Sequence, residues 1–297
     1  MSLKTATYGL SDGARGGGFA ASPGGPRPGP GARWTKFSCL LLVLCLFPWR
    51  EADCVETDEA QPEVWIHTTR QSAELPEASL LRVSNQLGDV RGRSSGDGTL
   101  LVAATIQRFA PDQADAEVLI THEDGAVVVR TRYPSAEQRR PDGRLNGRID
   151  LAVLVPAGGR MVVETDDGLV EVKGVDRDLS AKTGSGRLRV TTRRGLEAET
   201  REGELVAVIR NPAAESPARV VTESGRIHVD VLNRPDLTLF VRSKGSIRKR
   251  LDAYPGAALV SEGEVSELKL GEAPWFLQAS SATGSIDIRA LPANELR

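Results

Sequence analysis

The sequence predicts an all-β fold made of stacked copies of one short unit. Glycines recur in the second half of the chain at intervals of 17 to 22 residues, at Gly168, Gly186, Gly203, Gly225, Gly245, Gly263 and Gly284. On both sides of each glycine, apolar residues alternate with charged ones, which is the period of a half-buried β-strand. Residues of the same kind also recur at the same distance from the glycine. Self-similarity with a period of about twenty residues indicates stacked structural units.

Four columns of apolar residues define the unit when positions are counted from its glycine. They lie seven and five residues before the glycine and two and four residues after it. In the copy around Gly168 they hold Met161, Val163, Val170 and Val172. The residues between them are mostly Arg, Glu, Lys and Asp, so the pattern predicts an apolar inner face and a charged outer face.

Some copies depart from this regular spacing. Earlier, more distant copies centre on Gly88 and Gly125. The copies at Gly245 and Gly263 fit better with one residue fewer before the glycine, which predicts a tighter turn there.

A column of polar residues lies three positions before the glycine. It holds Asn85, His122, Thr165, Thr183, Thr200, Thr222 and Ser281. In a stack these side chains form a ladder near the turn, where hydroxyls bond the turn backbone and one another. His122 is predicted to replace a ladder threonine. The glycine is predicted to supply a corner with positive φ that a Cβ would resist.

Two architectures are compatible with such copies. Each copy is two short strands that cannot bury their apolar face alone, so several copies must stack. A unit of about twenty residues suits a single-stranded β-solenoid, in which each strand pairs with its counterpart in the next rung. The alternative is an antiparallel β-sandwich or meander with hairpins at the glycines. The solenoid is favoured because rung stacking requires like residues at like positions, and a sandwich does not.

The N-terminal residues differ from the repeats and predict export. Residues 1–32 are a Gly/Pro-rich leader without apolar periodicity, which predicts disorder. Residues 33–52 resemble a signal peptide, because a basic flank precedes the apolar run 39–49, which is too short to span a bilayer comfortably. Residues 53–79 are polar and are predicted to be a linker.

Cysteine usage bears on the export route. The cysteines are Cys39, Cys45 and Cys54. The first two lie in the signal-like segment, so a mature chain keeps at most Cys54, which excludes an internal disulfide and a Cys-rich metal site. Cys54 lies where a bacterial lipoprotein carries its acylated cysteine, but residues 51–53 do not resemble a lipobox. The sequence leaves open a membrane tether near the N-terminus and whether this segment is cleaved, retained or lipidated.

The rest of the chain divides into two regions. Residues 80–156 are predicted to be an N-terminal β region and cap, because an extra apolar stretch and a polar loop separate the copies there. Residues 157–291 are predicted to hold the β-solenoid repeats. Solenoids need atypical end units that hide their open strand edges.

The order of these motifs carries a family resemblance. Val83-Ser-Asn-Gln-Leu-Gly-Asp-Val90 is followed by 118–129, a polar loop, 151–156 and then the repeated phrase Val-x-Thr-x-x-Gly-x-Val-x-Val. From residue 80 to about 290 the chain resembles a bacterial family of β-strand-repeat envelope proteins named putative adhesins, a domain of unknown function. The resemblance implies a right-handed β-helix or related β-solenoid behind a signal peptide or membrane anchor. It implies no catalytic motif.

Composition narrows the class of partner. The net charge is −2, so the chain lacks the basic footprint of a nucleic-acid-binding protein. Apolar residues make up 40% of the chain but aromatic residues only 4%, which suits thin rungs filled by Val, Leu, Ile and Ala. The run Arg248-Lys249-Arg250 is interpreted as a solvated edge. The expected partner is an unknown macromolecule, either protein or polysaccharide.

Histidine and serine do not form recognisable sites. His67, His122 and His228 have no second histidine at metal-ligand spacing. A nucleophile elbow needs a helix after its serine, and none is predicted after Gly184-Ser185-Gly186 or Gly284-Ser285.

The acidic residues are interpreted in the same way, with one alternative left open. Asp97, Asp166 and Asp167 are read as turn residues, because the calcium-binding nonapeptide repeat is absent. Paired acids on a β-helix could cleave a glycosidic bond, and outward acids stand at Glu171, Glu197, Glu199 and Glu204. Their alternation with arginine favours a solvated charged sheet. No catalytic, cofactor-binding or metal-ligating residue is predicted, and no enzymatic activity.

Three functions are compatible with these features. The favoured one is an exported, non-enzymatic adhesin or envelope scaffold, in the periplasm or on the cell surface, that binds a macromolecule through its charged sheet face. A polysaccharide-binding or polysaccharide-cleaving β-helix would need a groove with clustered acids and exposed aromatics, for which the candidates are Phe240, Tyr254, Trp275 and Phe276. The third is an envelope-stress or regulatory partner of a membrane protein.

Overall fold

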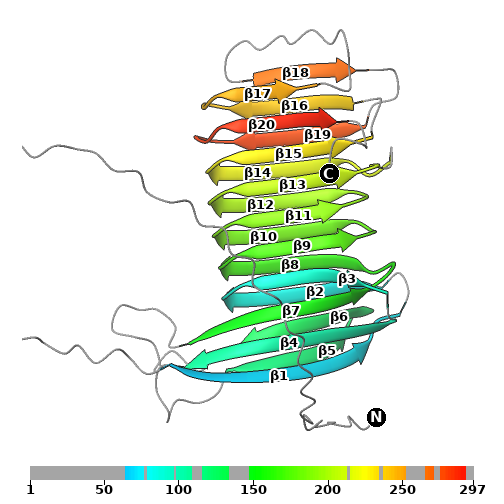
Figure 1. The fold of residues 1–297 in the computed structure, drawn as a ribbon, viewed down its shortest axis with the longest axis vertical. Helices are drawn as coiled ribbons and strands as arrows, with labels where there is room; N and C mark the ends of the chain where they lie inside the picture. The colour runs from blue at the N-terminus through cyan, green and yellow to red at the C-terminus, as the bar shows by residue number, and fades with distance from the viewer. Residues whose placement is uncertain are drawn as a thin grey trace, which may run out of the picture. The chain divides into compact units, whose positions relative to one another are not determined.

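The computed structural model describes residues 64–76, 79–96, 98–108, 116–133, 147–212, 215–233, 237–251, 265–270 and 275–291. These residues form twenty strands, β1 to β20, in two ten-stranded sheets (Figure 1). Within these ranges nothing helical is long and apolar enough to cross a bilayer. The all-β prediction is confirmed. The leader 1–32 and the signal-like segment 33–52 lie outside the described residues.

The two sheets are each built from alternate strands of the chain. In spatial order, sheet A consists of β1 (Trp65–Glu74), β4 (Thr99–Arg108), β7 (Arg148–Pro156), β3 (Val90–Ser95), β9 (Val170–Val175), β11 (Leu188–Thr192), β13 (Leu205–Arg210), β15 (Ile227–Leu232), β20 (Ile286–Leu291) and β17 (Ile247–Arg250). Sheet B consists of β18 (Val265–Leu270), β16 (Leu237–Ser243), β19 (Phe276–Ser281), β14 (Ala218–Ser224), β12 (Leu196–Glu202), β10 (Leu179–Ser185), β8 (Arg160–Asp167), β2 (Leu80–Leu87), β6 (Ala126–Arg132) and β5 (Glu117–Glu123).

The pairing within both sheets is mixed. In the middle, equivalent strands of different copies pair in parallel, as β8, β10, β12 and β14 do in sheet B. Antiparallel pairs stand at the ends, between β1, β4 and β7, between β5 and β6, and between β16 and β18. The arrangement of two sheets around one core fits the alternative prediction of a β-sandwich. That alternative predicted hairpins at the glycines, but the central strands pair in parallel.

One hydrophobic core lies between the sheets and contains the predicted columns. The side chains before and after the glycines, such as Leu81, Val163, Val170 and Leu188, are almost completely buried. Large and small residues complement each other: Met161 fills the space beside Gly92, where its Cε would lie 3.1 Å from an added Cβ. Most of these residues are aliphatic, so the core is thin.

The copies do not stack in the order of the sequence. The strands around Gly284, β19 and β20, lie between the copy around Gly225 and the copy around Gly245. Likewise β2 and β3 lie between β6 and β7 on one side and β8 and β9 on the other. The Gly245 copy has one residue fewer between its ladder serine and its glycine, since Ser243 pairs with Ser281. This irregular copy has a parallel neighbour on one side only.

The predicted linker 53–79 was wrong over residues 65–74, which form β1. This strand pairs antiparallel with β4 at ten consecutive positions. Its β-branched and aromatic residues favour a strand. The polar character suggested a linker because β1 is a sheet edge with both faces largely exposed, so the usual apolar alternation is missing.

The copy assigned to Gly125 is not a rung that spans both sheets, because both of its strands lie in sheet B. β5 and β6 form an antiparallel hairpin through Asp124 and Gly125, whose φ values of 49° and 74° suit a tight hairpin turn. Gly263 lies outside the described residues, and β18, which follows it, pairs antiparallel with β16.

The turn glycines bring the backbones of adjacent copies into close contact. Gly186 and Gly203 have φ values of 134° and 125°, and a Cβ added to Gly203 would lie 2.1 Å from the carbonyl oxygen of Gly186. The N–H of Gly186 donates to the carbonyl of Glu202 over 3.0 Å. Only glycine permits both this backbone conformation and this approach.

The predicted polar ladder is present beside the glycines. Register places Asn85, Thr165, Thr183, Thr200, Thr222, Ser281 and Ser243 in one row. The hydroxyl of Thr183 donates to the carbonyl of Gly168 over 3.0 Å, and the hydroxyl of Ser281 donates to that of Gly225 over 3.2 Å. The ladder therefore ties one copy to the turn of the next.

The assignment of His122 to this ladder was wrong. His122 lies exposed on β5, opposite Val127 of the hairpin. Thr131 of β6 takes the place beside Asn85, and its Oγ1 donates to Asn85 Oδ1 over 2.9 Å. The signal for Thr131 is the spacing of Val127, Val129 and Thr131, which matches the strand before each glycine, but no glycine follows it.

Gly203→Ala should lower the free energy of unfolding by about 2 kcal/mol or more, because the methyl group meets the Gly186 carbonyl and the backbone conformation disfavours a side chain. Urea unfolding measures the change. Gly98→Ala is the matched control, since an added Cβ there has no neighbour within 4 Å. Equal effects at the two positions would contradict the close-approach explanation.

Thr183→Val and Thr222→Val should differ although both positions are buried in the same row. The Thr183 hydroxyl lies within hydrogen-bond distance of two carbonyls, those of Gly168 and Ser185, whereas the Thr222 hydroxyl has no hydrogen-bond partner among the described residues. Thr183→Val should cost about 1–3 kcal/mol, and Thr222→Val should be neutral or stabilising. Thermal and urea unfolding of both variants provide the measurement, and a larger loss at Thr222 would show that the ladder bonds are not stabilising.

Candidate binding groove

A groove of about 490 Å³ crosses the starts of six neighbouring strands of sheet B, namely β2, β8, β10, β12, β14 and β19. Its row of outward side chains follows from the strand register. Val162, Ser180, Glu197, Arg219 and Gln278 lie opposite one another on successive strands. Strands in a sheet are separated by about 4.8 Å, so these five side chains span about 19 Å. The groove therefore follows the stacking direction and crosses the strands.

One aromatic side chain, Phe276, lines one end of the groove next to the buried Trp275. Trp275 is fully buried, and its Nε1 donates to the carbonyl of Ser216 over 2.8 Å. Phe276 follows it and, by the alternation of a strand, points to the other side, where 41% of it is exposed in the groove. The buried Trp275 thus anchors the strand that presents Phe276. Phe240 is half-buried on β16, and Tyr254 lies outside the described residues.

The charges along sheet B are joined by exposed ion pairs. Arg219 Nη1 lies 3.5 Å from Glu197 Oε1 and 3.8 Å from Glu199 Oε2, and Lys182 Nζ lies 3.7 Å from Glu199 Oε2. Such exposed pairs contribute about 0–1 kcal/mol each. A polar ligand can therefore replace one partner at little cost.

The remaining predicted acids lie elsewhere. Glu171 is on sheet A, where a hydrogen bond from Lys173, opposed by burial, lowers its pKa. Glu204 lies at the turn before β13, with Oε2 2.9 Å from Arg187 Nε. The four predicted glutamates are therefore divided between two sheets and a turn, and each has a cationic neighbour.

The other residues considered from the sequence lie apart from the groove. His67 is exposed on β1, Ser185 ends β10, and Asp166 and Asp167 end β8. Asp97 lies outside the described residues. Ser285 follows its turn glycine. Among the residues with described positions, no three His, Cys, Asp or Glu side chains gather as metal ligands would.

A second polar cluster, on the outer side of sheet A, was not foreseen. Asp230 accepts two hydrogen bonds of 2.6 Å from Arg289, and its Oδ1 lies 3.0 Å from His228 Nε2. His228 Nδ1 lies 3.6 Å from Asp287 Oδ2. Burial alone would raise the pKa of Asp230, but the hydrogen bonds from His228 and Arg289 outweigh it and lower the pKa. These residues occupy equivalent positions in the Gly225 and Gly284 copies. The cluster could be predicted from the sequence only if these two copies were known to be neighbours.

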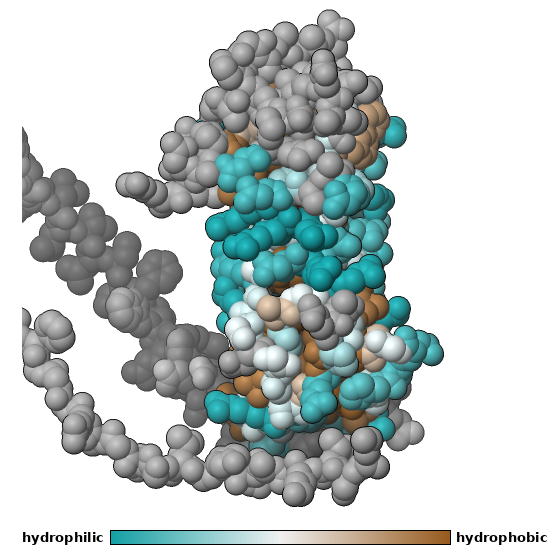
Figure 2. All heavy atoms as spheres, turned by 90° about the vertical axis from the view of Figure 1, so that its right-hand side faces the viewer, coloured by the Kyte–Doolittle hydropathy of each residue, from teal (hydrophilic) through white to brown (hydrophobic). Residues whose placement is uncertain are grey.

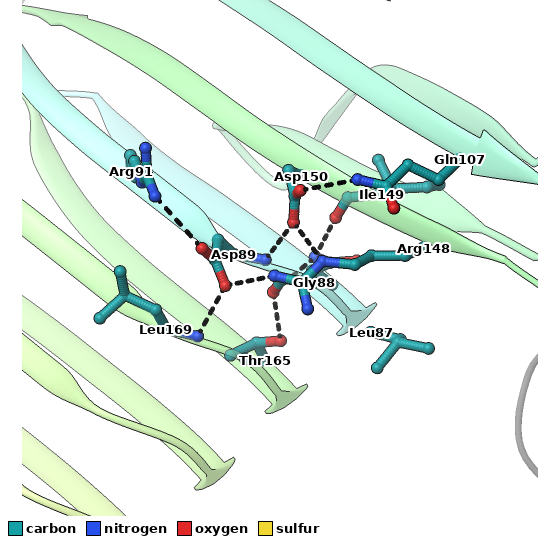
Figure 3. Close-up of polar contacts among 12 residues, drawn as sticks. Leu87, Gly88, Asp89, Arg91, Gln107, Arg148, Ile149, Asp150, Thr165 and Leu169 are labelled. Atoms are coloured by element: carbon teal, nitrogen blue, oxygen red, sulfur yellow. Dashed lines mark hydrogen bonds and ion pairs between the residues drawn. The ribbon is translucent and has the colours of Figure 1, made fainter. Parts of the chain in front are cut away.

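A third cluster connects the parallel and antiparallel parts of sheet A (Figure 3). Arg148 donates to Asp89 Oδ1 over 2.6 Å and to Asp150 Oδ1 over 2.8 Å. Asp89 also accepts from the backbone N–H of Leu169 over 3.1 Å. Burial would lower the pKa of Arg148, but the two carboxylates raise it. Because its hydrogen bonds are satisfied within the protein, this cluster fixes β7 against β3 and β9.

The hydrophilic character of the protein surface is compatible with the binding of a polar ligand. On the face shown in Figure 2, hydrophilic side chains form a broad band across the middle, and smaller apolar areas lie between and below them. The combination of weakly paired charges with one exposed aromatic ring makes the sheet B groove the candidate binding site.

Asp230→Asn should lower the free energy of unfolding at pH 7 by about 1–3 kcal/mol, because it weakens two charge-assisted hydrogen bonds. The folded state lowers the pKa of Asp230, so its carboxylate stabilises the fold above its ordinary pKa of about 3.9. That contribution is lost as the pH falls through the folded-state pKa. The difference from the wild type should therefore shrink below about pH 4 in urea unfolding. Asp166→Asn, at the exposed end of β8, is the control, and a difference that persists undiminished in acid would contradict the assignment.

Comparison with known proteins gives structural neighbours. No protein-family model and no curated protein matches the chain. A solved structure from Clostridium sporogenes, titled a putative cell adhesion protein, is 10% identical over 76% of this chain and 100% of that one, with a TM-score of 0.42. Putative adhesins from Bacteroides fragilis and Parabacteroides merdae are 10% and 8% identical, cover 76% and 74% of this chain and 97% and 95% of their own, and have TM-scores of 0.30 and 0.26.

Proposed function

We propose that this chain is an exported, non-enzymatic adhesin or envelope scaffold that binds a macromolecule through the outer face of sheet B. The observation that supports this most strongly is the groove across six strands, lined by the exposed Glu197–Arg219 ion pair and by Phe276. In this proposal the parallel part of both sheets is a right-handed, single-stranded β-solenoid. The antiparallel strands β1, β4, β5 and β18 are its caps.

The direction of the groove favours a long ligand. Neighbouring strands offer a new polar group about every 4.8 Å along the stack, so an extended polymer can make several contacts at once. Each contact is weak because the groove is open and its ion pairs are exposed. Only a ligand that makes several of these weak contacts at once binds with useful affinity. Such a ligand is a macromolecule and not a small molecule.

A polysaccharide is the second candidate, and the composition of the groove favours it over a peptide strand. The strands beneath the groove are paired on both sides, so their backbones cannot accept an added strand. Recognition must come from side chains, here a carboxylate, a guanidinium, an amide, a hydroxyl and an aromatic face. This set can hydrogen-bond sugar hydroxyls and stack on a sugar ring.

A binding assay with the purified full chain tests both candidates. The wild type should bind isolated bacterial envelope material, and a glycan array should identify polysaccharide ligands. Phe276→Ala and Arg219→Ala should each weaken binding by about 5- to 30-fold, the effect of losing a central aromatic or arginine contact. Leu119→Ala changes an apolar residue of similar exposure on β5 and should have no effect.

The outcomes separate the candidates. Binding to envelope protein without any glycan signal would reject the polysaccharide candidate and retain the adhesin. Binding that is insensitive to both groove substitutions would reject the groove. Cell fractionation of the full chain tests export, and a chain confined to the cytoplasm would contradict the proposed role.

A further inference from the structure

The outer strands of the two sheets differ in how well their open edges are protected. In sheet A, β17 is four residues long and carries Arg248, Lys249 and Arg250. Lys249 pairs with the fully buried Ile288, so its side chain is on the inner side of the sheet. In sheet B, β5 ends in Glu117 and Glu123, which pair with Arg132 and Arg130 of β6. Short strands, charged residues and inward-pointing charges prevent pairing with other chains.

Strand β1 is less protected, although it carries the exposed charged residues Arg70 and Glu74. It is ten residues long and is the outermost strand of sheet A among the described residues. Its register with β4 is unbroken, without a bulge, and it contains no proline and no lysine. Val64, Trp65 and Ile66 at its start are 44%, 38% and 67% exposed. A long edge strand with exposed apolar residues is a template for an added strand.

We propose that β1 is a homodimer interface, in which β1 of a second copy of this chain pairs antiparallel with its outer edge. Sheet A then continues from one copy into the other. A twofold axis relates the copies, as in most homodimers. No described strand pairs with the outer side of β1, and in the dimer the identical strand supplies that pairing.

The residues of β1 suit one symmetric register. Twofold antiparallel pairing places one residue opposite itself, and with Thr69 at the centre, Trp65 faces Ala73 and Thr68 faces Arg70 across the axis. The large indole thus lies beside a small side chain, and no like charges face each other. Opposed threonines contribute favourably to antiparallel pairs. Centring the pair on Arg70 would place two guanidinium groups opposite each other, which is unfavourable.

The register predicts opposite effects for two substitutions at one exposed position. Thr68→Arg places a second guanidinium opposite Arg70 twice in the dimer and should raise the dimer dissociation constant at least tenfold. Thr68→Glu places a carboxylate opposite Arg70 twice and should lower that constant. Thr68 is exposed and pairs with Thr105 of β4, so neither change should unfold the monomer. His122→Arg and His122→Glu, on the exposed edge strand β5, are matched controls that should leave the constant unchanged.

Sedimentation equilibrium of the purified full chain over a dilution series measures the dissociation constant. Hydrogen exchange gives a second readout, in which the amides of residues 65–74 become more protected as concentration rises. A chain that is monomeric at all concentrations would overturn the proposal. So would a dimer that responds equally to Thr68→Arg and Thr68→Glu, or one that responds only to the His122 variants.

Discussion

The close approach of neighbouring backbones at the turn glycines is the constraint on which the rest of this structure depends. A Cβ at Gly225 would lie 1.9 Å from the carbonyl oxygen of Gly203, and one at Gly284 would lie 1.6 Å from that of Gly225. The Ser281 hydroxyl beside Gly284 donates to the same Gly225 carbonyl, and the Thr183 hydroxyl makes the equivalent bond to the Gly168 carbonyl. The turn therefore sets the distance and the register between neighbouring copies. The strands before and after the turn pair in that same register.

Register at the turn decides the outer surface as well as the core. The register places equivalent positions of neighbouring copies side by side. Apolar side chains therefore pack on apolar side chains in the inward columns. In the outward columns, residues from copies that are distant in sequence come together. Asp230 and Arg289 meet in this way over 59 residues, and Glu197 meets Arg219 across adjacent strands. The groove is a consequence of the same rule, because its wall is one outward row. Surface sites in such a protein are thus formed by residues at equivalent positions on neighbouring strands.

Sequence reasoning predicted what depends on local pattern. The inward columns, the polar ladder and the turn glycines follow from alternation and spacing, and in the parallel copies they are where the pattern places them, whereas the Gly125 copy and His122 are not. The order of the copies could not be predicted, because any two copies match each other almost equally well. The groove and the Asp230 cluster were missed for this reason, since both depend on β19 and β20 lying beside β14 and β15. Strand β1 was missed because an edge strand exposed on both faces has no apolar alternation.

The insertion of the last copy between two earlier ones has a consequence for synthesis. Strands β16 and β17 are made before β19 and β20, yet β19 and β20 supply their parallel neighbours. The contacts of β16 and β17 with the stack therefore form only after residues 276–291 have been made. Until then the stack ends at β14 and β15, whose outer edges are open. Completion of the fold therefore waits for the synthesis of β19 and β20, and a chain truncated before β19 loses two copies, not one.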